Sequence, residues 1–141
     1  MKGDPLPDCD HISRYCPYTR LTESGGPSGA AFRLRKEEKY LSVNWLEILG
    51  QSNRANEIAE LRSILSRHIT LAPSGRLAVL NVGAVQSHVL INSTDSRSLR
   101  ILHEPLDNDA SHTGIFDMNE DDDLIADLIA QIVIEVYPAQ I

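Results

Sequence analysis

Two cysteines, a histidine, an arginine and a tyrosine lie within the eight residues CDHISRYC, from Cys9 to Cys16. Thiolates and imidazoles bind zinc, and His103 or His112 could add the remaining ligand of a tetrahedral site. Structural zinc sites usually place two cysteines roughly two to four residues apart in a hairpin, whereas these two flank a stretch with the character of a strand. The spacing therefore does not favour a metal site, and we expect none.

The same cysteines are candidates for nucleophilic catalysis, which requires a lowered pKa and an adjacent base. Cys9 and Cys16 have candidate bases only as sequence neighbours. Disulfides are rare in a reducing compartment, so we expect both residues to be free thiols that serve packing.

Polar side chains in three short segments could instead meet in one cleft, because the segments resemble strands or strand ends. The candidate polar cleft consists of His11, Arg14, Tyr15, Ser42, Asn44, Ser111 and His112. Two histidines, an arginine and hydroxyls suit an anionic ligand such as a nucleotide or an RNA phosphate, with Arg14 as a bidentate anchor. The alternative is that these groups cap turns or face solvent, as polar residues on strands often do.

The patterns of common ligand loops are incomplete in this chain. The run DMNEDDD resembles the start of a calcium-binding loop, but position six is Asp122 instead of glycine and position twelve is Leu128 instead of glutamate. The positive N-terminal end of a following helix explains these acidic residues better. The chain has no phosphate loop or dinucleotide fingerprint, although Gly83, between a strand and a helix, could offer backbone amides to an anion.

The elements that must position these residues are predicted from hydrophobic periodicity. Strands are expected at 11–16, 40–46, 76–82, 98–104 and 111–117, and helices at 53–68, 83–90 and from about Asp121 to Val136. The last helix is expected to be long, because the apolar residues from Leu124 to Val136 form a wide stripe at helical spacing. We therefore expect one α+β domain over residues 1–141, with a mixed or mostly antiparallel sheet, one central helix and an extended N-terminal tail at 1–8.

Charge is distributed unevenly along the 141 residues. The formal net charge is −7, and residues 77–141 hold 2 Lys or Arg against 11 Asp or Glu. An acidic surface argues against broad binding of duplex DNA, which depends on neutralising phosphates. The acidic second half predicts a protein partner, because a negative face steers a basic one. A local basic patch remains open, formed by Arg14, Arg20, Arg33, Arg35 and Lys36.

Targeting signals are absent from the sequence. No apolar run approaches the roughly 20 residues that span a bilayer, and the first ten residues lack the apolar centre of a signal peptide. We therefore expect no membrane contact and a cytoplasmic location.

The order of short motifs resembles a family of small bacterial proteins of uncharacterised function. The motifs are DHISRY, AAF, LSVNWLE, NVG and ILHEPLDNDASHTGI, which extend from Asp10 to the last helix. The resemblance implies no known activity, substrate or cofactor. In that family a hydrophobic residue can stand at the position of Cys16, which weighs further against the metal and thiol interpretations.

Two classes of function follow from these observations. The first, which we favour here, is a non-catalytic interaction or accessory module from a mobile-element, defence or toxin–antitoxin setting, since no complete catalytic motif is present. The second is a small enzyme acting on a nucleotide or RNA, with His11 or His112 as acid or base and Arg14 holding phosphate or a nicotinamide dinucleotide. An ADP-ribosyl transferase-like arrangement belongs to this second class, although the sequence assigns no decisive glutamate. No cofactor is expected.

Overall fold

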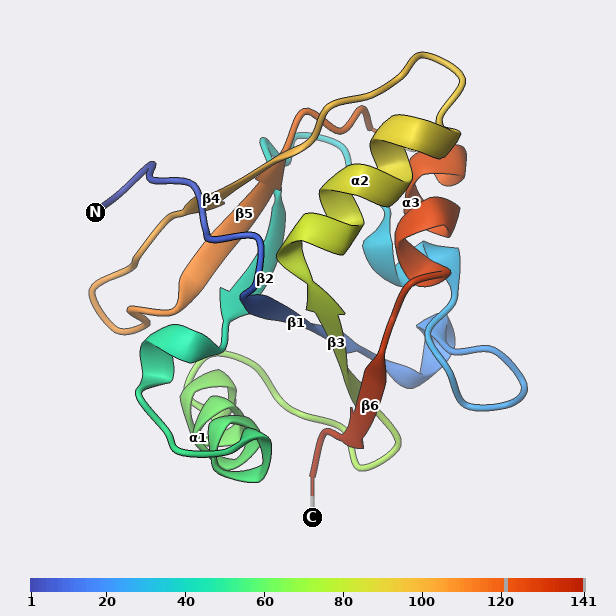
Figure 1. The fold of residues 1–141 in the computed structure, drawn as a ribbon. Coiled ribbons are helices and arrows are strands. Elements are labelled where there is room, and N and C mark those ends of the chain that lie inside the picture. The colour runs from blue at the N-terminus through green and yellow to red at the C-terminus, as the bar shows by residue number, and fades with distance from the viewer. Residues whose placement is uncertain (121, 141) are drawn as a thin grey trace.

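Six strands form one sheet in the computed structural model, which describes residues 1–120 and 122–140 (Figure 1). Their order across the sheet is β4-β5-β2-β1-β3-β6, and every neighbouring pair is antiparallel. The strands are β1 (His11–Cys16), β2 (Leu41–Trp45), β3 (Arg76–Asn81), β4 (Arg100–His103), β5 (His112–Phe116) and β6 (Glu135–Pro138). Together with three helices, this sheet confirms the expected α+β class.

The helices begin at the polar residues that cap them. The α-helices are α1 (Arg54–Ser66), α2 (Val82–Asn92) and α3 (Asp123–Ala130), and the 3₁₀ turns are η1 (Tyr18–Arg20), η2 (Gly29–Phe32) and η3 (Glu47–Leu49). The side chains of Asn53, Asn81 and Asp122 accept hydrogen bonds from amides three residues on, at 2.9, 2.9 and 3.3 Å. Each bond satisfies an amide that the first turn of the helix leaves free.

The C-terminal helix is much shorter than the sequence indicates. It ends at Ala130, and Glu135–Pro138 forms β6, which pairs with β3. The Ile134 amide already donates to Val79 O at 2.9 Å. Branched residues favour strands, and the open edge of β3 supplies the hydrogen-bond partners that a strand needs. The expectation of one helix to Val136 is therefore wrong, while its expected start, residue 121, lies outside the described residues.

One face of the sheet is closed by α2, α3 and η2. Ile12 and Leu80 from the strands, Phe32 from η2, Val85 from α2 and Ile129 from α3 are fully buried in this core. Figure 1 shows α2 and α3 side by side on this side of the sheet, and α3 also packs on η2. This face holds most of the buried apolar side chains that stabilise the fold.

The opposite face of the sheet is covered only in part. Ile58 and Leu61 of α1 pack against Leu77 and Val79 of β3, with Tyr15 of β1 at the border. This second cluster contains no residue of β2 or β5 among those the structure describes. The part of the face that these two strands form therefore lacks the apolar cover that the first face has.

The N-terminal residues 1–8 combine a turn with a segment that is attached to the sheet. The Leu6 amide donates to Ile101 O at 3.0 Å, the His103 amide donates to Asp4 O at 2.8 Å, and the Leu6 side chain is buried. The segment thus lies along β4 and satisfies backbone groups at an edge of the sheet that would otherwise be unpaired.

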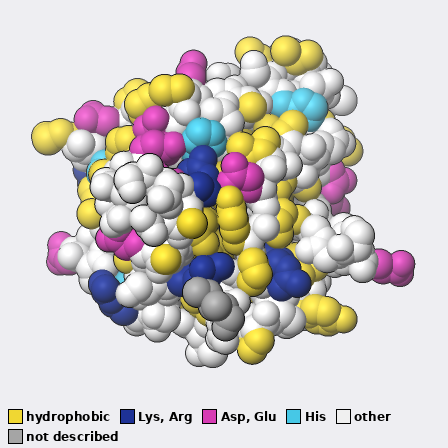
Figure 2. Space-filling view, turned by 60° about the horizontal axis from the view of Figure 1, so that its bottom comes forward, with side chains coloured by type: hydrophobic (Ala, Val, Ile, Leu, Met, Phe, Trp, Pro, Cys, Tyr) yellow, Lys and Arg dark blue, Asp and Glu magenta, His cyan; other side chains and the backbone are white. Residues whose placement is uncertain are grey.

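Surface character is mixed. Figure 2 shows Lys and Arg side chains separated from one another by hydrophobic and uncharged side chains on the face seen there. Within residues 1–120 and 122–140, no helix has both the length and the apolar character needed to cross a membrane.

Candidate functional site

A cavity of about 540 Å³ lies over the part of the sheet that α1 leaves uncovered. Its floor is formed by Ser13 and Tyr15 of β1, Ser42 and Asn44 of β2, and His112 of β5. Alternate residues of a strand share a face, and the register pairs Ser13 with Asn44 and Asn44 with His112. The alternation that the sequence shows therefore places these five side chains on one floor.

The walls of the cavity combine cations with apolar side chains. Arg20, which ends η1, and Arg35, which precedes β2, lie on one part of the rim. Neither guanidinium makes a hydrogen bond or an ion pair within the described part of the chain. Leu65, Ile69 and Leu106 supply apolar surface. The volume is within the range of small-molecule sites, roughly 300–1,000 Å³.

Arg14 reaches the cavity from the other face of its strand. β1 pairs with β2 only at Ile12 and Ser13, so the two strands separate beyond that point. Backbone groups of alternate residues point to opposite neighbours, which turns the Ser42 carbonyl toward this gap. The Arg14 guanidinium fills it, donating from Nη1 to Ser42 O at 2.8 Å and from Nε to Ala31 O at 2.9 Å. Desolvation lowers the Arg14 pKa from its ordinary value.

Ser42 and His112 form a hydrogen-bonded pair on the cavity floor. His112 Nδ1 lies 2.8 Å from Glu104 O, and its Nε2 lies 3.3 Å from Ser42 Oγ. A carbonyl oxygen only accepts, so Nδ1 carries a proton, and in the neutral form of the ring Nε2 has a lone pair that can accept from the serine hydroxyl. The ring of Tyr40 packs edge-on against His112 with centroids 5.8 Å apart.

A glycine beneath this pair makes room for the tyrosine. A Cβ atom on Gly114, opposite Ser42 in β5, would lie 2.5 Å from Tyr40 Cδ1. A Cβ atom at this distance would displace the Tyr40 ring. Because the Tyr40 ring packs against the His112 imidazole, the imidazole would lose this contact.

A buried carboxylate fixes the amide of Asn44. Asp109 accepts hydrogen bonds from Asn44 Nδ2 at 2.9 Å, Ser111 Oγ at 2.6 Å and the Ser111 amide at 3.0 Å. Asn44 Nδ2 also donates to Ser111 Oγ at 2.8 Å. This network links β2 to the loop before β5, so it supports the floor rather than leaving free groups for a ligand.

The Ser13 hydroxyl is a different case. The residue is only 2% exposed, yet its Oγ has no hydrogen-bond partner among the described residues, and it lines the cavity. Buried hydroxyls are almost always hydrogen-bonded, because leaving one unpaired costs about 1–3 kcal/mol. Because the residue lines the cavity, its hydroxyl is a candidate partner for a polar group of a bound molecule.

The structure brings together five of the seven residues predicted for the polar cleft: Arg14, Tyr15, Ser42, Asn44 and His112. Their role in binding remains a prediction. His11 and Ser111 do not line the cavity. His11 Nδ1 lies 2.7 Å from Glu47 Oε2, which draws the ring toward η3, and Ser111 lies behind the floor in the Asp109 network. The Tyr15 hydroxyl already has a partner in the protein, since it accepts a hydrogen bond from the Ala72 amide at 3.1 Å.

Several residues that line the cavity were not predicted to belong to it. These are Ser13, Pro17, Arg20, Arg35, Glu38, His68 and Asp109, with the apolar wall of Leu65, Ile69 and Leu106. Arg20 and Arg35 do belong to the basic patch expected from the sequence, and with Arg33 and Lys36 they line a smaller adjoining cavity of about 210 Å³. Arg33 is already engaged there, because its Nη2 pairs with Asp123 at 2.7 Å.

The remaining sequence candidates have other environments. Cys9 is exposed and Cys16 is buried, and burial raises the pKa of the Cys16 thiol to about 12. No group of three potential metal-ligating side chains occurs in residues 1–120 and 122–140. The Gly83 amide donates to Asp8 O at 3.0 Å and the Val82 amide donates to Asp10 O at 2.9 Å. These two amides at the start of α2 already have partners, so they are not free for the anion that the position of Gly83 left possible.

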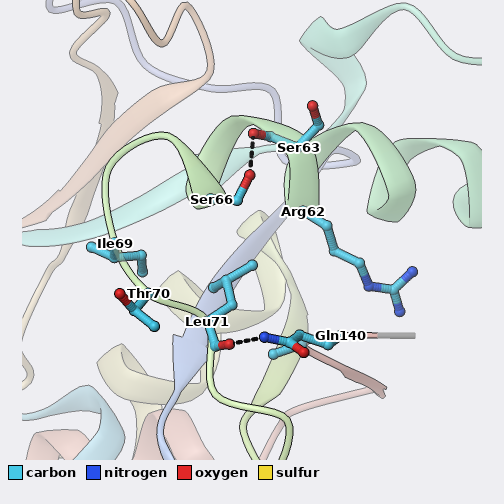
Figure 3. A pocket seen from close by; sticks show the side chains of 8 residues that line it. Arg62, Ser63, Ser66, Ile69, Thr70, Leu71 and Gln140 are labelled. Atoms are coloured by element: carbon cyan, nitrogen blue, oxygen red, sulfur yellow. Dashed lines mark hydrogen bonds between the residues drawn. The ribbon is translucent and has the colours of Figure 1, made fainter.

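A second hollow of about 580 Å³ lies between the end of α1 and the last residues of the chain (Figure 3). Three of its polar side chains donate to backbone carbonyls of the protein: Arg62 to Pro138 O, Ser66 to Ser63 O and Gln140 to Leu71 O. No buried polar atom without a partner lines it among the described residues. We therefore take the cavity over the sheet as the candidate site.

Comparison with known proteins adds no assignment to this geometry: no family model, curated protein or solved structure matches the chain.

Proposed function

We propose that the protein binds a small phosphorylated ligand of the nucleotide class in the cavity over β1, β2 and β5. The observation that carries this proposal is the unpartnered Ser13 hydroxyl, buried in a cavity whose rim holds two arginines without described partners. A buried hydroxyl without a partner is unfavourable for stability, whereas the exposed Arg35 guanidinium is hydrated and costs little. Both kinds of group are available to an anionic ligand.

The distribution of side chains supports a nucleotide rather than a bare anion. Arg20 and Arg35 provide donors for phosphate oxygens at one part of the rim, and guanidinium groups match phosphate geometry. Leu65, Ile69 and Leu106 give an apolar surface on which a flat base can pack. The adjoining basic cavity shares Arg20 and Arg35, so a second phosphate can extend into it.

Calorimetric titration with AMP and ADP at one fixed salt concentration tests this proposal. We expect both to bind, with ADP tighter, and we expect Arg20→Ala and Arg35→Ala each to weaken binding about tenfold, or about 1.4 kcal/mol. Arg62→Ala is the matched control, because it removes the same charge from the hollow of Figure 3 and should leave binding unchanged. Binding of neither nucleotide, or equal loss in the control, contradicts the proposal.

A groove beside α3 favours a second candidate, the interaction module with a basic protein partner. Leu124 is 66% exposed, and Asp95, Asp122 and Asp127 surround it in a groove of about 270 Å³. An exposed leucine within an acidic rim suits a basic amphipathic segment. A synthetic Lys- and Leu-rich helical peptide should bind in fluorescence anisotropy, and Asp127→Asn should weaken it. A mobile-element, defence or toxin–antitoxin setting remains a hypothesis of the sequence alone.

A further inference from the structure

Resting on the proposed function, we infer that Ser42 and His112 are a nucleophile and its base, which hydrolyse a phosphate ester bound in the cavity. A serine becomes a nucleophile when an adjacent base accepts its proton and a third group fixes that base. Here Ser42 Oγ lies 3.3 Å from His112 Nε2, and His112 Nδ1 lies 2.8 Å from Glu104 O. Ser42 and His112 both line the cavity, and the Glu104 carbonyl fixes the imidazole from outside it.

The direction of the hydrogen bond is the one that catalysis needs. Because the Glu104 carbonyl holds the proton on Nδ1, the neutral imidazole can only accept at Nε2, so Ser42 donates. Tyr40 packs against the ring, and Gly114 leaves the space that the tyrosine occupies. Tyr40 and Gly114 are thus positioning residues, and they fix the ring independently of any ligand.

Ser42 differs from the other hydroxyls near it. Ser111 and Thr113 are fully buried and donate to Asp109 Oδ1 and to Ser111 O. Ser42 is only half-buried, lines the cavity and contacts an imidazole nitrogen. It is the hydroxyl of this group that a substrate can reach.

Positive charge lies beside the nucleophile. Arg14 Nη1 donates to the carbonyl of Ser42 itself, and the Arg14 side chain also lines the cavity. Charge that develops on the oxygens of a phosphoryl group in the transition state is stabilised by fixed guanidinium groups. Arg14 is held by two backbone carbonyls, so its position requires no rearrangement when the substrate binds.

The reaction has two balanced steps with water as the co-reactant. In the first, Ser42 Oγ bonds to phosphorus, the bond from phosphorus to the leaving oxygen breaks, and the serine proton passes through His112 Nε2 to the leaving alcohol. In the second, water attacks the phosphoserine and gives a proton to His112 Nε2. The bond from phosphorus to Ser42 Oγ breaks, the proton returns to Ser42, and inorganic phosphate leaves.

A fluorophosphonate reagent tests the pair without knowledge of the natural substrate. Its phosphorus reacts with activated serines and releases fluoride, and intact-mass spectrometry with peptide mapping locates the adduct. We expect one adduct on Ser42, none in Ser42→Ala, and a labelling rate about 100-fold lower in His112→Gln. Glutamine has no basic ring nitrogen, so this variant removes the base and keeps a polar side chain of similar length. Ser63→Ala, an exposed serine of the Figure 3 hollow, is the matched control and should label normally.

The inference is overturned if the wild-type protein takes up no reagent, if the adduct lies on another serine, or if His112→Gln labels at the wild-type rate. Circular dichroism of each variant shows that the comparison is made between folded proteins. Titration with AMP separates this inference from the proposed function. If AMP binds but Ser42 is not labelled, the catalytic pair is rejected and the proposed binding site is retained. If AMP does not bind and Ser42 is not labelled, both are rejected.

Discussion

The two faces of the sheet differ in the side chains that cover them. The face under α2, α3 and η2 is filled with apolar side chains such as Phe32, Val85 and Ile129. The opposite face is sealed by α1 near β3, but over β2 and β5 it exposes hydroxyls, an imidazole and unpaired guanidinium groups. Antiparallel sheets often leave one face to solvent, so an open face alone does not require a ligand. The apolar face holds most of the core, and we propose that the polar part of the other face binds a ligand.

The largest contrast between the faces is expected in thiol reactivity. Cys16 lies in the closed core with its pKa raised to about 12, whereas Cys9 is exposed before β1. A raised pKa keeps the thiol protonated, so at pH 8 only about one Cys16 in 10⁴ is the reactive thiolate. Iodoacetamide at pH 8 should therefore modify one thiol per native chain and two after denaturation. Rapid modification of Cys16 in the native protein would show that this face opens.

The next largest effect is the loss of apolar packing on the closed face. Ile129 is 0% exposed, and Ile129→Ala should lower the free energy of unfolding by about 2–5 kcal/mol in urea titration. Leu124→Ala on the same helix is the control, because that side chain is largely exposed and should change stability by less than about 0.5 kcal/mol. Equal effects of the two substitutions would place the core elsewhere.

The substitution Arg14→Met tests how much the guanidinium between β1 and β2 contributes to stability. Arg14→Met keeps much of the side-chain volume but removes the donors to Ala31 O and Ser42 O. We expect a loss of about 1.5–3 kcal/mol in the free energy of unfolding, since these are charge-assisted hydrogen bonds. Arg35→Met removes a cation without such bonds and should leave stability unchanged. A stable Arg14→Met protein would mean that the gap between β1 and β2 closes without the guanidinium.

The smallest expected effect on the free energy of unfolding is that of Ser13→Ala, and it is an increase instead of a loss. Ser13→Ala removes a buried hydroxyl that has no partner, so stability should stay the same or rise by up to about 1 kcal/mol, while AMP binding weakens. Thr113→Val has nearly the same shape and removes a buried hydroxyl that does donate, to Ser111 O at 3.0 Å. This control should lower stability by about 1 kcal/mol. If Ser13→Ala destabilises the protein as much as the control does, the hydroxyl has a structural partner.

Much of the fold could be predicted from local pattern. The composition of HISRYC and the alternation in LSVNW predict the strands β1 and β2, and Asn53 predicts the start of α1. The end of the C-terminal helix could not be predicted in this way. Leu124 to Val136 fits a helical stripe throughout, and only the free edge of β3, a feature of the tertiary structure, turns 135–138 into a strand.

The candidate site was predictable in its floor and not in its walls. Alternation places Ser42 and Asn44 on one face, but it also places His11 there, and Glu47 of η3 binds that ring outside the cavity. Arg14 has the opposite parity and enters only because β1 and β2 separate. Arg20 and Arg35 lie between the strands in sequence, where no periodicity reports where a side chain points.

The central claim, that the open face binds a phosphorylated ligand, is tested most directly by a two-dimensional NMR titration of the ¹⁵N-labelled protein with AMP. We expect saturable shifts of the amide signals of Ser13, Ser42 and His112 and no shift of the amide signals from the closed face. No shift at millimolar AMP, or shifts confined to residues 62–71 around the hollow of Figure 3, would contradict it.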